Sequence, residues 1–386
     1  MLPLKRNTTQ INERIITEGK TRFCIPDYRD TSGPGTADMI VFYNPVMSLN
    51  RDFSVLFFSS DVEIKKGLDG LAATGARGIR VKNETDHPVE MHLNDHSPVA
   101  ESIMMKNAKE NDVSVTIHRE NLNTLLSSQY FDYIDIDPFG SPVDFIPMAI
   151  RSVRNRGYLA ITATDTGALC GSYPKACLRR YGFHNIKGSF LHETGVRGLI
   201  SHVIREAAKF DRYVNPVLTQ SLDHYYRIHF QVFNGARKAD KMLQELSSLP
   251  KFYGVDPSTE SGYPTFINRS DLQDDHGPFY IGPLHQRKLL DSMIKSVESA
   301  TIHNPERAEK LLNFYLDECD QPAFYYETDR ISKHLKCSTP SMDSIFSSLA
   351  DLGFSTARTQ FSPTGFKTNA PYSELRSIFL PGGERT

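Results

Sequence analysis

Residues 131–142 bring an acid, a proline and an aromatic ring together where an apolar strand runs into a turn. Asp137 and the carbonyl oxygen of Pro138 could accept the two hydrogens of an exocyclic amine on a nucleobase, and Phe139 offers a ring for base stacking. Pro138 would fix the turn, so that both acceptors are in place beforehand. The alternative is structural, because an acid followed by proline is also a common helix N-cap.

Such an amine is a poor nucleophile, because its lone pair is delocalised into the ring. Accepting both hydrogens would draw the nitrogen toward tetrahedral geometry and aim the lone pair at an electrophilic methyl group. Asp137 need not be a strong base, since positive charge grows on the nitrogen only during transfer. The segment Asp-Pro-Phe-Gly also resembles the (Asn/Asp)-Pro-Pro-(Tyr/Phe) loop of amino-methyltransferases.

Three other polar segments each follow a predicted strand. Asp69 precedes small residues up to Gly75, which suits a ligand with an amino group, such as the methionine part of S-adenosylmethionine (SAM). Asp95 could accept the ribose hydroxyls of a nucleoside cofactor, and Glu120 with Asn121 would lie near its adenine edge. An ordinary strand–helix turn or a helix cap would explain the first two segments equally well if each stood alone. No G-x-G-x-x-G is present at the first turn, which disfavours dinucleotide binding.

Alternating strands and helices between residues 62 and 233 would position these groups. We expect strands at Glu63–Leu71, Val89–Leu93, Val113–His118, Phe131–Ile136, Gly157–Ala163, Asn215–Leu222 and Tyr225–Phe233, with helices at Ser97–Ala108 and Leu199–Lys209. The alternation predicts an α/β unit with a mostly parallel sheet that ends in an antiparallel hairpin, the order found in class I (Rossmann-like) methyltransferases. Lys65 and Lys66 make the first strand a poor one, so its assignment depends on the segment that follows.

The composition is that of an ordinary globular protein. The 386 residues are 39% hydrophobic and 23% charged, with a formal net charge of −2. No apolar run approaches the roughly 20 residues that span a bilayer, and the first residues lack the apolar core of a signal peptide. The five cysteines have no zinc-ligand spacing. We therefore expect a cytoplasmic protein with no membrane association and no metal; its oligomeric state is not indicated.

Positive charge is concentrated in one segment. Residues 151–239 contain 14 Lys and Arg and 5 Asp and Glu, a net charge of +9, which leaves −11 on the remaining chain. This asymmetry predicts one basic surface for a polyanionic substrate, with Arg179 and Arg180 as candidate contacts. The alternative is a set of solvated helix faces.

The sequence changes character near residue 235. We expect a domain over residues 1–235, comprising an N-terminal segment and the methyltransferase fold, and a C-terminal α+β domain over residues 236–386. Helices are predicted at Lys238–Leu246 and Gln286–Ala300, around a loop-rich stretch at Val255–Pro278. The last 65 residues predict a helix at Asp329–Lys336, a helix at Ser341–Leu352 and a hairpin at Phe354–Phe366, a pattern that resembles a winged helix. The alternative to nucleic-acid docking by this module is a structural packing role.

These segments together resemble the tRNA (guanine-26-N2)-dimethyltransferase family, particularly its archaeal members. The matching segments are Glu18–Lys20, Val41–Asp52, Leu68–Arg80, Leu93–Asp95, Asp135–Pro142, Thr162–Asp165, Leu169–Gly171, Ala176–Tyr181, Asp223–Arg227 and Gly282–Leu284. The match covers about residues 18–290, and its most specific parts are Phe-Tyr-Asn-Pro…Asn-Arg-Asp and Asp-Pro-Phe-Gly.

The resemblance implies SAM as the methyl donor, bound by Arg51, Arg77, Asp95, Glu120 and Asn121. It also implies that Asp137 is the catalytic acid, that Phe42 and Phe139 flank the target guanine, and that the C-terminal domain over residues 236–386 binds tRNA. Glu120 departs from the Asp-Ala-type pair more common in the family, and the paired zinc-binding cysteines of some relatives are absent.

The leading hypothesis is therefore an enzyme that methylates the N2 amine of guanine 26 in tRNA, once or twice. An amino-methyltransferase that acts on DNA, on another RNA base or on a free nucleoside is the first alternative. A non-catalytic RNA-binding protein of the same fold is the second, and the intact Asp137–Gly140 loop argues against it, since binding alone needs no amine acceptor.

Overall fold

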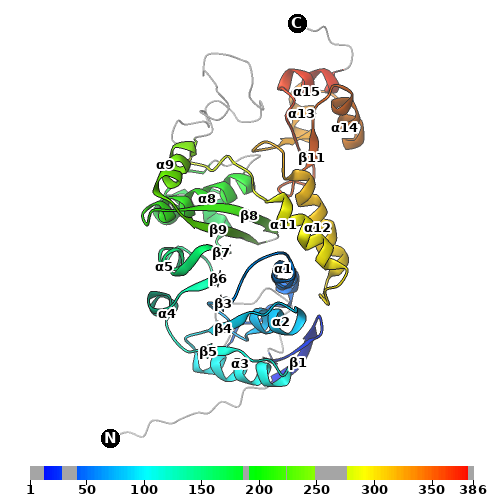
Figure 1. Cartoon of the computed structure of the whole chain (residues 1–386). Helices are drawn as coiled ribbons and strands as arrows, with labels where there is room; N and C mark the ends of the chain where they lie inside the picture. Colours follow the sequence, from blue (N-terminus) through cyan, green and yellow to red (C-terminus); the bar gives the residue numbers. More distant parts are fainter. Residues whose placement is uncertain (1–12, 28–40, 186–190, 223, 248–275, 381–386) are drawn as a thin grey trace, which may run out of the picture.

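A seven-stranded sheet forms the centre of the computed structural model, which describes residues 13–27, 41–185, 191–222, 224–247 and 276–380 (Figure 1). The strand order is β5-β4-β3-β6-β7-β9-β8. The strands are β3 (Lys66–Asp69), β4 (Glu90–Asn94), β5 (Thr116–His118), β6 (Phe131–Ile136), β7 (Val153–Ala163), β8 (Arg212–Leu222) and β9 (Tyr225–Asn234). Strands β3 to β7 pair in parallel, whereas β9 is antiparallel to both β7 and β8. The predicted parallel sheet with a terminal hairpin is thus confirmed.

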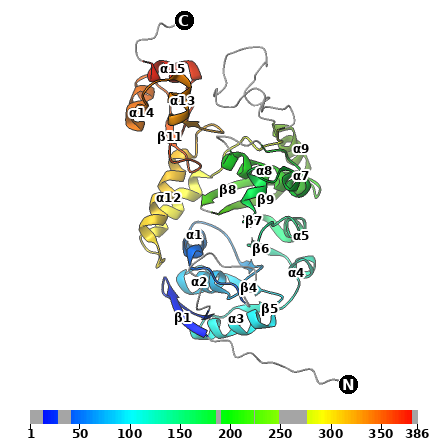
Figure 2. The same cartoon turned by 180° about the vertical axis from the view of Figure 1, so that it is seen from behind.

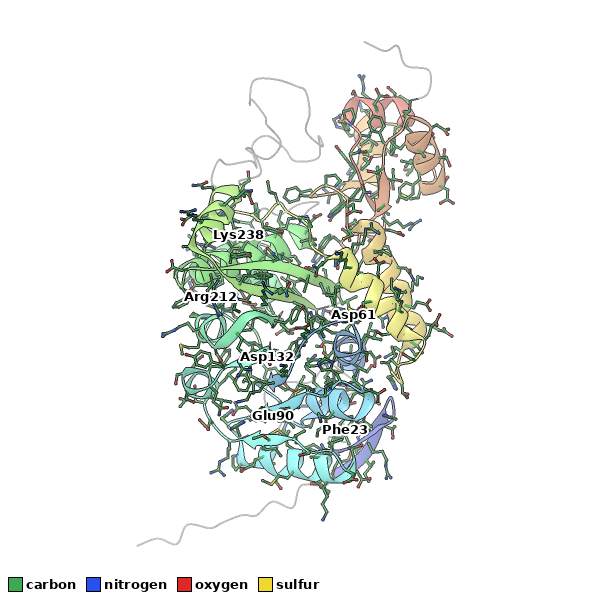
Figure 3. The ribbon with its side chains drawn as sticks, viewed as in Figure 1. Phe23, Asp61, Glu90, Asp132, Arg212 and Lys238 are labelled. Carbon is green, nitrogen blue, oxygen red and sulfur yellow. The ribbon has the colours of Figure 1, made fainter. Side chains whose placement is uncertain are left out.

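Every strand predicted for this sheet is present, and the predicted and observed strands differ only in the residues at which they begin or end. β3 is shorter than the predicted Glu63–Leu71, and β7 begins before the predicted Gly157. The lysine pair is accommodated at the start of β3, where the Asp132 Oδ2 atom accepts hydrogen bonds from the backbone N–H groups of Lys65 at 3.0 Å and Lys66 at 2.8 Å. Figure 3 labels this aspartate at the amino end of β6.

Helices cover both faces of the sheet (Figures 1 and 2). One face packs against α4 (Leu122–Ser128), α5 (Ile146–Ser152) and α8 (Leu191–Ala208); the other packs against α1 (Ser48–Ser59), α2 (Ala76–Glu84) and α3 (Pro98–Glu110). The two apolar clusters have the sheet between them, as expected for a doubly wound α/β unit. The carboxyl ends of the parallel strands therefore meet at one edge, where loops can gather ligand-binding groups.

Several elements near the N-terminus were not predicted from the sequence. They are the antiparallel hairpin of β1 (Glu13–Glu18) and β2 (Thr21–Pro26), the short 3₁₀ helix η1 (Pro45–Met47), and α1. Gly19 forms the hairpin turn with φ +56°, and a Cβ there would lie 2.5 Å from the Glu84 carboxylate. All but two residues of α1 are buried, so the helix shows little of the polar–apolar alternation that reveals surface helices.

Residues beyond β9 form α9 (Ala236–Glu245), α11 (Arg287–Val297) and α12 (Pro305–Glu318). The predicted helices at Lys238–Leu246 and Gln286–Ala300 correspond to α9 and α11. Helices α11 and α12 share the apolar cluster of α1, and the Ser292 hydroxyl accepts a 2.9 Å hydrogen bond from the Asp61 backbone N–H. Most of Val255–Pro278 lies outside the described residues. The domain boundary at residues 235 and 236 stays a prediction.

The C-terminal residues form a small module with its own apolar cluster. It contains β10 (Tyr326–Glu327), α13 (Thr328–Leu335), α14 (Met342–Asp351), β11 (Thr356–Arg358), β12 (Gly365–Thr368) and α15 (Tyr372–Phe379). The predicted helix–helix–hairpin order is present, with β10 added as a third antiparallel strand and α15 as a final helix. The order from β10 to β12 is that of a winged helix.

A buried ion-pair cluster joins this module to the rest of the molecule. Lys367, on β12, places its Nζ atom 2.8 Å from Glu193 Oε1 on α8 and 3.0 Å from Glu318 Oε1 on α12. Arg197 lies 2.9 Å from the same Glu193 oxygen. Because unpaired buried charges are strongly destabilising, these pairs hold the module in a defined orientation.

Candidate active site

Asp137 lies directly after β6, in a loop that is anchored at its far end. The Gly140 N–H donates to the Thr164 hydroxyl at 2.7 Å, and the Thr164 N–H donates to the Gly140 carbonyl at 3.0 Å. The next helix, α5, begins only at Ile146, with Phe145 at its N-cap. The alternative interpretation of Asp137 as a helix N-cap is therefore wrong. Its side chain is 21% exposed, which leaves it accessible from solvent.

The two aromatic residues expected to flank a base lie against each other. The Phe42 and Phe139 ring centroids are 4.5 Å apart, with the rings nearly perpendicular. Phe139 is 52% exposed, which is unusual for a large apolar side chain and makes it accessible for stacking. The structure thus brings together two predicted residues from distant parts of the chain, beside the loop that carries Asp137.

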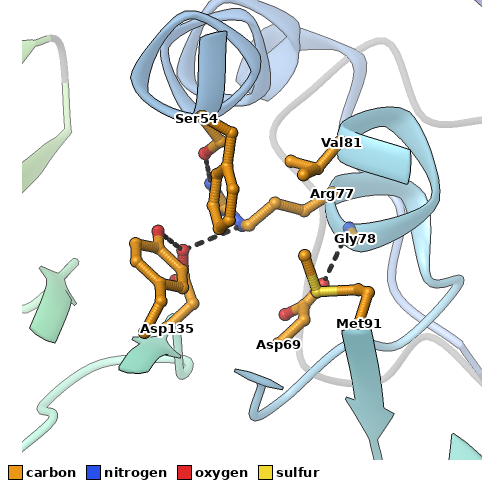
Figure 4. A pocket seen from close by; sticks show the side chains of 9 residues that line it. Ser54, Asp69, Arg77, Gly78, Val81, Met91 and Asp135 are labelled. Carbon is orange, nitrogen blue, oxygen red and sulfur yellow. Dashed lines mark hydrogen bonds and ion pairs between the residues drawn. The ribbon is translucent and has the colours of Figure 1, made fainter. Parts of the chain in front are cut away.

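Arg77, on α2, is the centre of the polar contacts behind this loop (Figure 4). Its Nη2 atom pairs with Asp137 Oδ2, and its Nε atom lies 3.5 Å from Asp135 Oδ2. Its Nη1 atom donates to Asn50 Oδ1 at 2.6 Å and to Ser54 Oγ at 2.8 Å, both on α1. Arg77 therefore fixes the orientation of the Asp137 carboxylate and ties it to two helices.

Asp135 and Arg227 form a second, fully buried pair beneath Arg77. The two Arg227 Nη atoms lie 3.0 and 2.5 Å from the two Asp135 carboxylate oxygens, and Tyr133 donates its hydroxyl to Asp135 Oδ2 at 2.7 Å. Burial alone would raise the pKa of Asp135, but Arg227 and Arg77 outweigh it and hold that pKa below its usual range. The carboxylate thus stays ionised and can share Arg77 with Asp137.

Asp69, at the end of β3, is buried beside these groups. Its Oδ2 atom accepts a hydrogen bond from the Gly78 N–H at 3.3 Å, and it lines the small cavity drawn in Figure 4. Burial first, and then the neighbouring carboxylates of Asp135 and Asp137, raise the pKa of Asp69 to about 7, against the opposing effect of Arg77. Its predicted role opposite an amino group of SAM stays a prediction.

This raised pKa predicts a pH dependence of stability. An aspartate has a pKa of about 4 in the unfolded chain, so between about pH 4 and pH 7 the folded state keeps a proton that the unfolded state has lost. The stabilising contribution of Asp69 to the free energy of unfolding is therefore fully present below about pH 4 and is lost as pH rises toward 7. The free energy of unfolding can be measured with urea at pH 5 and at pH 8. From pH 5 to pH 8 it should fall less in Asp69→Asn than in the natural protein. Equal losses would contradict the assignment.

Asp95 follows β4 and shapes the loop beside β3. Its Oδ2 atom accepts from the Ala73 N–H at 3.1 Å, and its Oδ1 atom accepts from the Ser97 N–H at 2.9 Å. Ser97, rather than Asp95, caps α3. Gly75 precedes α2 as its N-cap residue with φ +75°, a conformation that favours glycine. Both residues therefore lie at the carboxyl edge of the sheet, as predicted, and the carboxylate of Asp95 is 14% exposed.

Glu120 and Asn121 lie at the same edge, after β5. The Asn94 side chain accepts from the Glu120 N–H at 3.2 Å and donates to the Gly70 carbonyl at 3.0 Å, which links the ends of neighbouring strands. Asn121 caps α4 by accepting from the Asn123 N–H at 3.0 Å. Both predicted residues are exposed at the surface, and their roles toward SAM stay predictions.

Arg51 lies in a buried charge network rather than at an open surface. Its Nε atom donates to Glu18 Oε2 at 2.8 Å, and its Nη2 atom donates to the Asn44 carbonyl at 2.9 Å. Although burial opposes it, Arg51 with Tyr43 and Arg80 lowers the pKa of Glu18 to about 2. The structure thus shows a structural partner for Arg51, and its predicted contact with SAM stays a prediction.

Arg80 completes this network, a role that the sequence analysis did not predict. Its Nη2 atom lies 2.6 Å from Asp52 Oδ1 and 2.8 Å from Glu84 Oε2, and its Nη1 atom lies 3.2 Å from Glu18 Oε2. Only the Arg80–Glu84 pair has the helical i, i+4 spacing that a sequence can reveal. The other partners come from β1 and α1.

The predicted phosphate contacts lie on α7 (Pro174–Tyr181), close to the loop that carries Asp137. Arg180 pairs with Asp165 at 2.9 Å, and Tyr181 donates to the same carboxylate at 2.5 Å. The Tyr181 hydroxyl also lies 2.9 Å from the Ser141 hydroxyl, four residues beyond Asp137. Arg179 is exposed, and both arginines stay predicted substrate contacts.

Within the described ranges, no helix is long and apolar enough to cross a bilayer. The same residues include no cluster of three or more His, Cys, Asp or Glu side chains arranged to hold a metal ion.

Comparison with known proteins places the chain in a family. The family model for N2,N2-dimethylguanosine tRNA methyltransferase matches residues 19–380. A tRNA (guanine(26)-N(2))-dimethyltransferase from Thermococcus kodakarensis is 39% identical, with 94% of this chain and 98% of that protein covered. The enzyme of the same name from Saccharolobus islandicus is 37% identical, with 93% and 97% covered.

A solved structure agrees with these matches. Trm1 from Pyrococcus horikoshii in complex with S-adenosyl-L-methionine superposes with a TM-score of 0.80 at 34% identity, covering 95% of this chain and 99% of that one. The class I methyltransferase fold and the family resemblance seen in the sequence are therefore confirmed. The chain belongs to the N2,N2-dimethylguanosine tRNA methyltransferase family.

Proposed function

We propose that this enzyme methylates the exocyclic N2 amine of guanine 26 in tRNA, with SAM as the methyl donor and Asp137 as the residue that orients the amine. Family membership over almost the whole chain supports the activity. The observation that carries the site assignment is the accessible Asp137 carboxylate, fixed on one side by Arg77, beside the exposed ring of Phe139.

The chemistry follows from how these groups are held. Arg77 binds Oδ2 of Asp137, which leaves Oδ1 to accept a hydrogen from the guanine amine, while the Pro138 carbonyl accepts the second. The base would stack on Phe139, whose ring is in nearly perpendicular contact with that of Phe42. Because these acceptors are fixed before the substrate arrives, little reorganisation opposes the transition state. The leaving proton can pass to Asp137 or to water once the nitrogen carries positive charge.

The polar groups at the carboxyl edge of the sheet fit SAM. Asp95 offers a partly exposed carboxylate for a ribose diol, and Glu120 and Asn121 lie at the neighbouring strand end, where the adenine would be. Gly75 keeps the first turn free of a side chain. When bound, SAM supplies the electrophilic methyl group. We also propose that Arg51 and Arg77 contribute to SAM binding and that Asp69 lies opposite the amino group of SAM.

Asp95→Ala is expected to weaken SAM binding by about 1.5–3 kcal/mol, roughly 10- to 150-fold, because the ribose hydroxyls would lose a charged acceptor. Isothermal titration calorimetry measures the affinity directly. Asp86→Ala is a suitable control, since Asp86 lies in the segment that precedes β4, at the opposite end of that strand. Unchanged SAM affinity in the Asp95 variant would remove this residue from the cofactor site.

Binding of tRNA is proposed to use the basic segment 151–239, with Arg179 and Arg180 among its phosphate contacts, together with the C-terminal region. The logarithm of the tRNA affinity should then fall linearly with the logarithm of the salt concentration. Reversing the charge of Arg179 and Arg180 should reduce that slope and leave SAM affinity unchanged. A slope near zero for the natural protein would contradict this surface.

All five cysteines are free thiols, which is usual for proteins of reducing compartments. With tRNA as the substrate, we propose a cytoplasmic location.

An inosine substitution tests the proposed reaction, because inosine differs from guanosine only by lacking the N2 amine. Transfer of a labelled methyl group from SAM should be observed with tRNA carrying guanosine at position 26. It should disappear when inosine occupies that position alone. Equal labelling of both tRNAs would mean that another atom or another nucleotide is methylated.

A further inference from the structure

The outer face of α7 places an exposed aromatic ring next to basic side chains. Tyr173, at the N-cap position of this helix, is 66% exposed, the largest exposed fraction of any large hydrophobic side chain in the described ranges. Cys177 and Tyr181 are buried, whereas Lys175 and Arg179 are exposed about one helical turn apart on the opposite face. Figure 2 labels α7 next to α8 and at a distance from α3. Tyr173, Lys175 and Arg179 are named the α7 surface below.

Two of these residues are poor choices for the helix itself. Tyrosine is not a preferred N-cap residue, and Tyr173 makes no side-chain capping hydrogen bond. Lys175 lies in the first turn, where the helix dipole disfavours a cation, and it is followed at i+4 by the like charge of Arg179. Departures from local helix preferences are expected where function requires them. Tyr173 and Lys175 therefore indicate a binding role.

The acids around the α7 surface leave its positive charge in place. In the described part of the chain, the helices that pack most closely against α7 are α6 (Thr166–Leu169) and α8. The acids of α8 and of the segment from β7 to α7 are Asp165, Glu193 and Glu206. Each has a cation within 2.9 Å. The exposed Asp144 lies toward α4, where its carbonyl accepts a 3.0 Å hydrogen bond from Asn123. The α7 surface is therefore not neutralised by these carboxylates.

Contacts within the fold place Tyr173 near the loop that carries Asp137. The Tyr173 N–H donates to the Gly167 carbonyl at 3.2 Å, and its ring lies against Gly167, where an added Cβ would be 2.9 Å from Tyr173 Cε2. Thr164, three residues before Gly167, accepts the 2.7 Å hydrogen bond from the Gly140 N–H. Three residues span at most about 11 Å, so the Tyr173 ring rests close to the end of the Asp137 loop.

An aromatic ring beside two cations suits a strand of nucleic acid. A base can stack on the ring whichever base it is, and the neighbouring phosphates can meet the cations. The proposed substrate is a polyanion whose target base lies at the adjoining loop, so its charge and its position both match the α7 surface.

We propose that the α7 surface binds the tRNA strand beside the guanine that is methylated, with an unpaired base stacked on Tyr173 and the adjoining phosphates near Lys175 and Arg179. The inference rests on the proposed function, because it requires tRNA at the Asp137 loop. It goes beyond the basic segment proposed above, since it assigns a base-stacking residue and the nucleotides that this residue meets. The stacked base then holds the strand while the target guanine is turned into the site.

A photo-crosslinking amino acid at position 173 tests the occupant directly, in the full-length protein with tRNA and SAM. We expect a crosslink within about four nucleotides of position 26, because about 11 Å corresponds to three or four nucleotides of a stacked strand. A crosslink to a distant part of the tRNA, to a second copy of the chain, or to no RNA at all would overturn the proposal.

Substitutions of Tyr173 separate stacking from packing. Tyr173→Leu keeps an apolar side chain but removes the aromatic face, and it should weaken tRNA binding roughly 5- to 150-fold. Tyr173→Phe keeps the ring and should bind tRNA like the natural protein. Tyr130→Leu is the matched control, since Tyr130 is 62% exposed and immediately precedes β6, at the end of the sheet opposite the site. SAM affinity should be unchanged in all three variants. Equal tRNA affinities of the two Tyr173 variants would contradict a stacking role.

Lys175→Glu separates tRNA binding from helix stability. A carboxylate is favourable in the first turn and can pair with Arg179 at i+4, so the melting temperature of the free protein should rise. Binding of tRNA should nevertheless weaken, and its salt slope should fall by about one. Lys109→Glu makes the same charge change at an exposed position in the last turn of α3 and should leave the slope unchanged. A natural salt slope in Lys175→Glu, or weaker binding together with a lower melting temperature, would count against the α7 surface.

The outcomes distinguish this inference from the proposed function. If the natural protein transfers no methyl group to tRNA, the proposed function fails. If it methylates tRNA but Tyr173→Leu and Lys175→Glu bind tRNA like their controls, the function stands and the assignment of the α7 surface alone is overturned.

Discussion

Asp137→Ala is expected to lower the single-turnover rate of methyl transfer by roughly 10²–10³-fold, the usual consequence of losing one preorganised hydrogen-bond partner in an active site. The fold should survive, because Asp137 caps no helix and Arg77 keeps Asp135, Asn50 and Ser54 as partners. Binding of tRNA should persist, since phosphate contacts lie elsewhere. The assay is rapid-quench methyl transfer at saturating tRNA and SAM, beside a melting curve.

Two further variants sharpen this experiment. Asp137→Asn should retain more activity than Asp137→Ala, because an amide oxygen can still accept one hydrogen from the amine. Asp144→Ala changes an exposed acid of the same loop and should transfer methyl groups at the natural rate. A folded Asp137→Ala protein with undiminished transfer would show that the amine is oriented by another residue.

Arg227→Met is expected to destabilise the protein by about 3–5 kcal/mol, because it leaves the fully buried Asp135 carboxylate without its closest cation. Arg77 would then be drawn toward Asp135, so any folded protein should also show slower methyl transfer through a displaced Asp137. Urea unfolding at neutral pH measures the loss of stability.

The double variant Arg227→Met with Asp135→Asn separates charge from packing. Removing both charges takes away the unpaired carboxylate, so the double variant should be more stable than Arg227→Met alone. If the double variant is instead less stable by the sum of the two single effects, the pair does not interact in the way that the 2.5 and 3.0 Å contacts indicate.

The strands and their polar ends could be predicted because both signals are local. Phe131–Ile136 is a mostly apolar segment that ends in a turn, and the acids at positions 95 and 137 directly follow strands of this kind, whereas Asp69 is the last residue of β3. Parallel strands bring their carboxyl ends to one edge, so predicting the strands also predicted that these acids lie at one edge. The pairing of Phe42 with Phe139 came from the family resemblance, since no local pattern connects them.

The charge networks behind the site could not be predicted in the same way. Arg77 contacts Asp137 and Asn50, and Arg227 contacts Asp135, across long stretches of sequence. The sequence does not distinguish a buried arginine from an exposed one, because only the fold brings its charged partner close. For the same reason α1 was missed: ten of its twelve residues are buried, so its sequence has no polar face to reveal the helical period.

Nucleoside analysis of one purified tRNA, after incubation with the enzyme and SAM, tests the central claim most directly. Mass spectrometry of the nucleosides identifies the methylated atom and the number of methyl groups, and sequencing of fragments locates the position. We predict N2-methylguanosine and N2,N2-dimethylguanosine at position 26. Methylation of a ring nitrogen, of a ribose or of a different nucleotide would contradict the account.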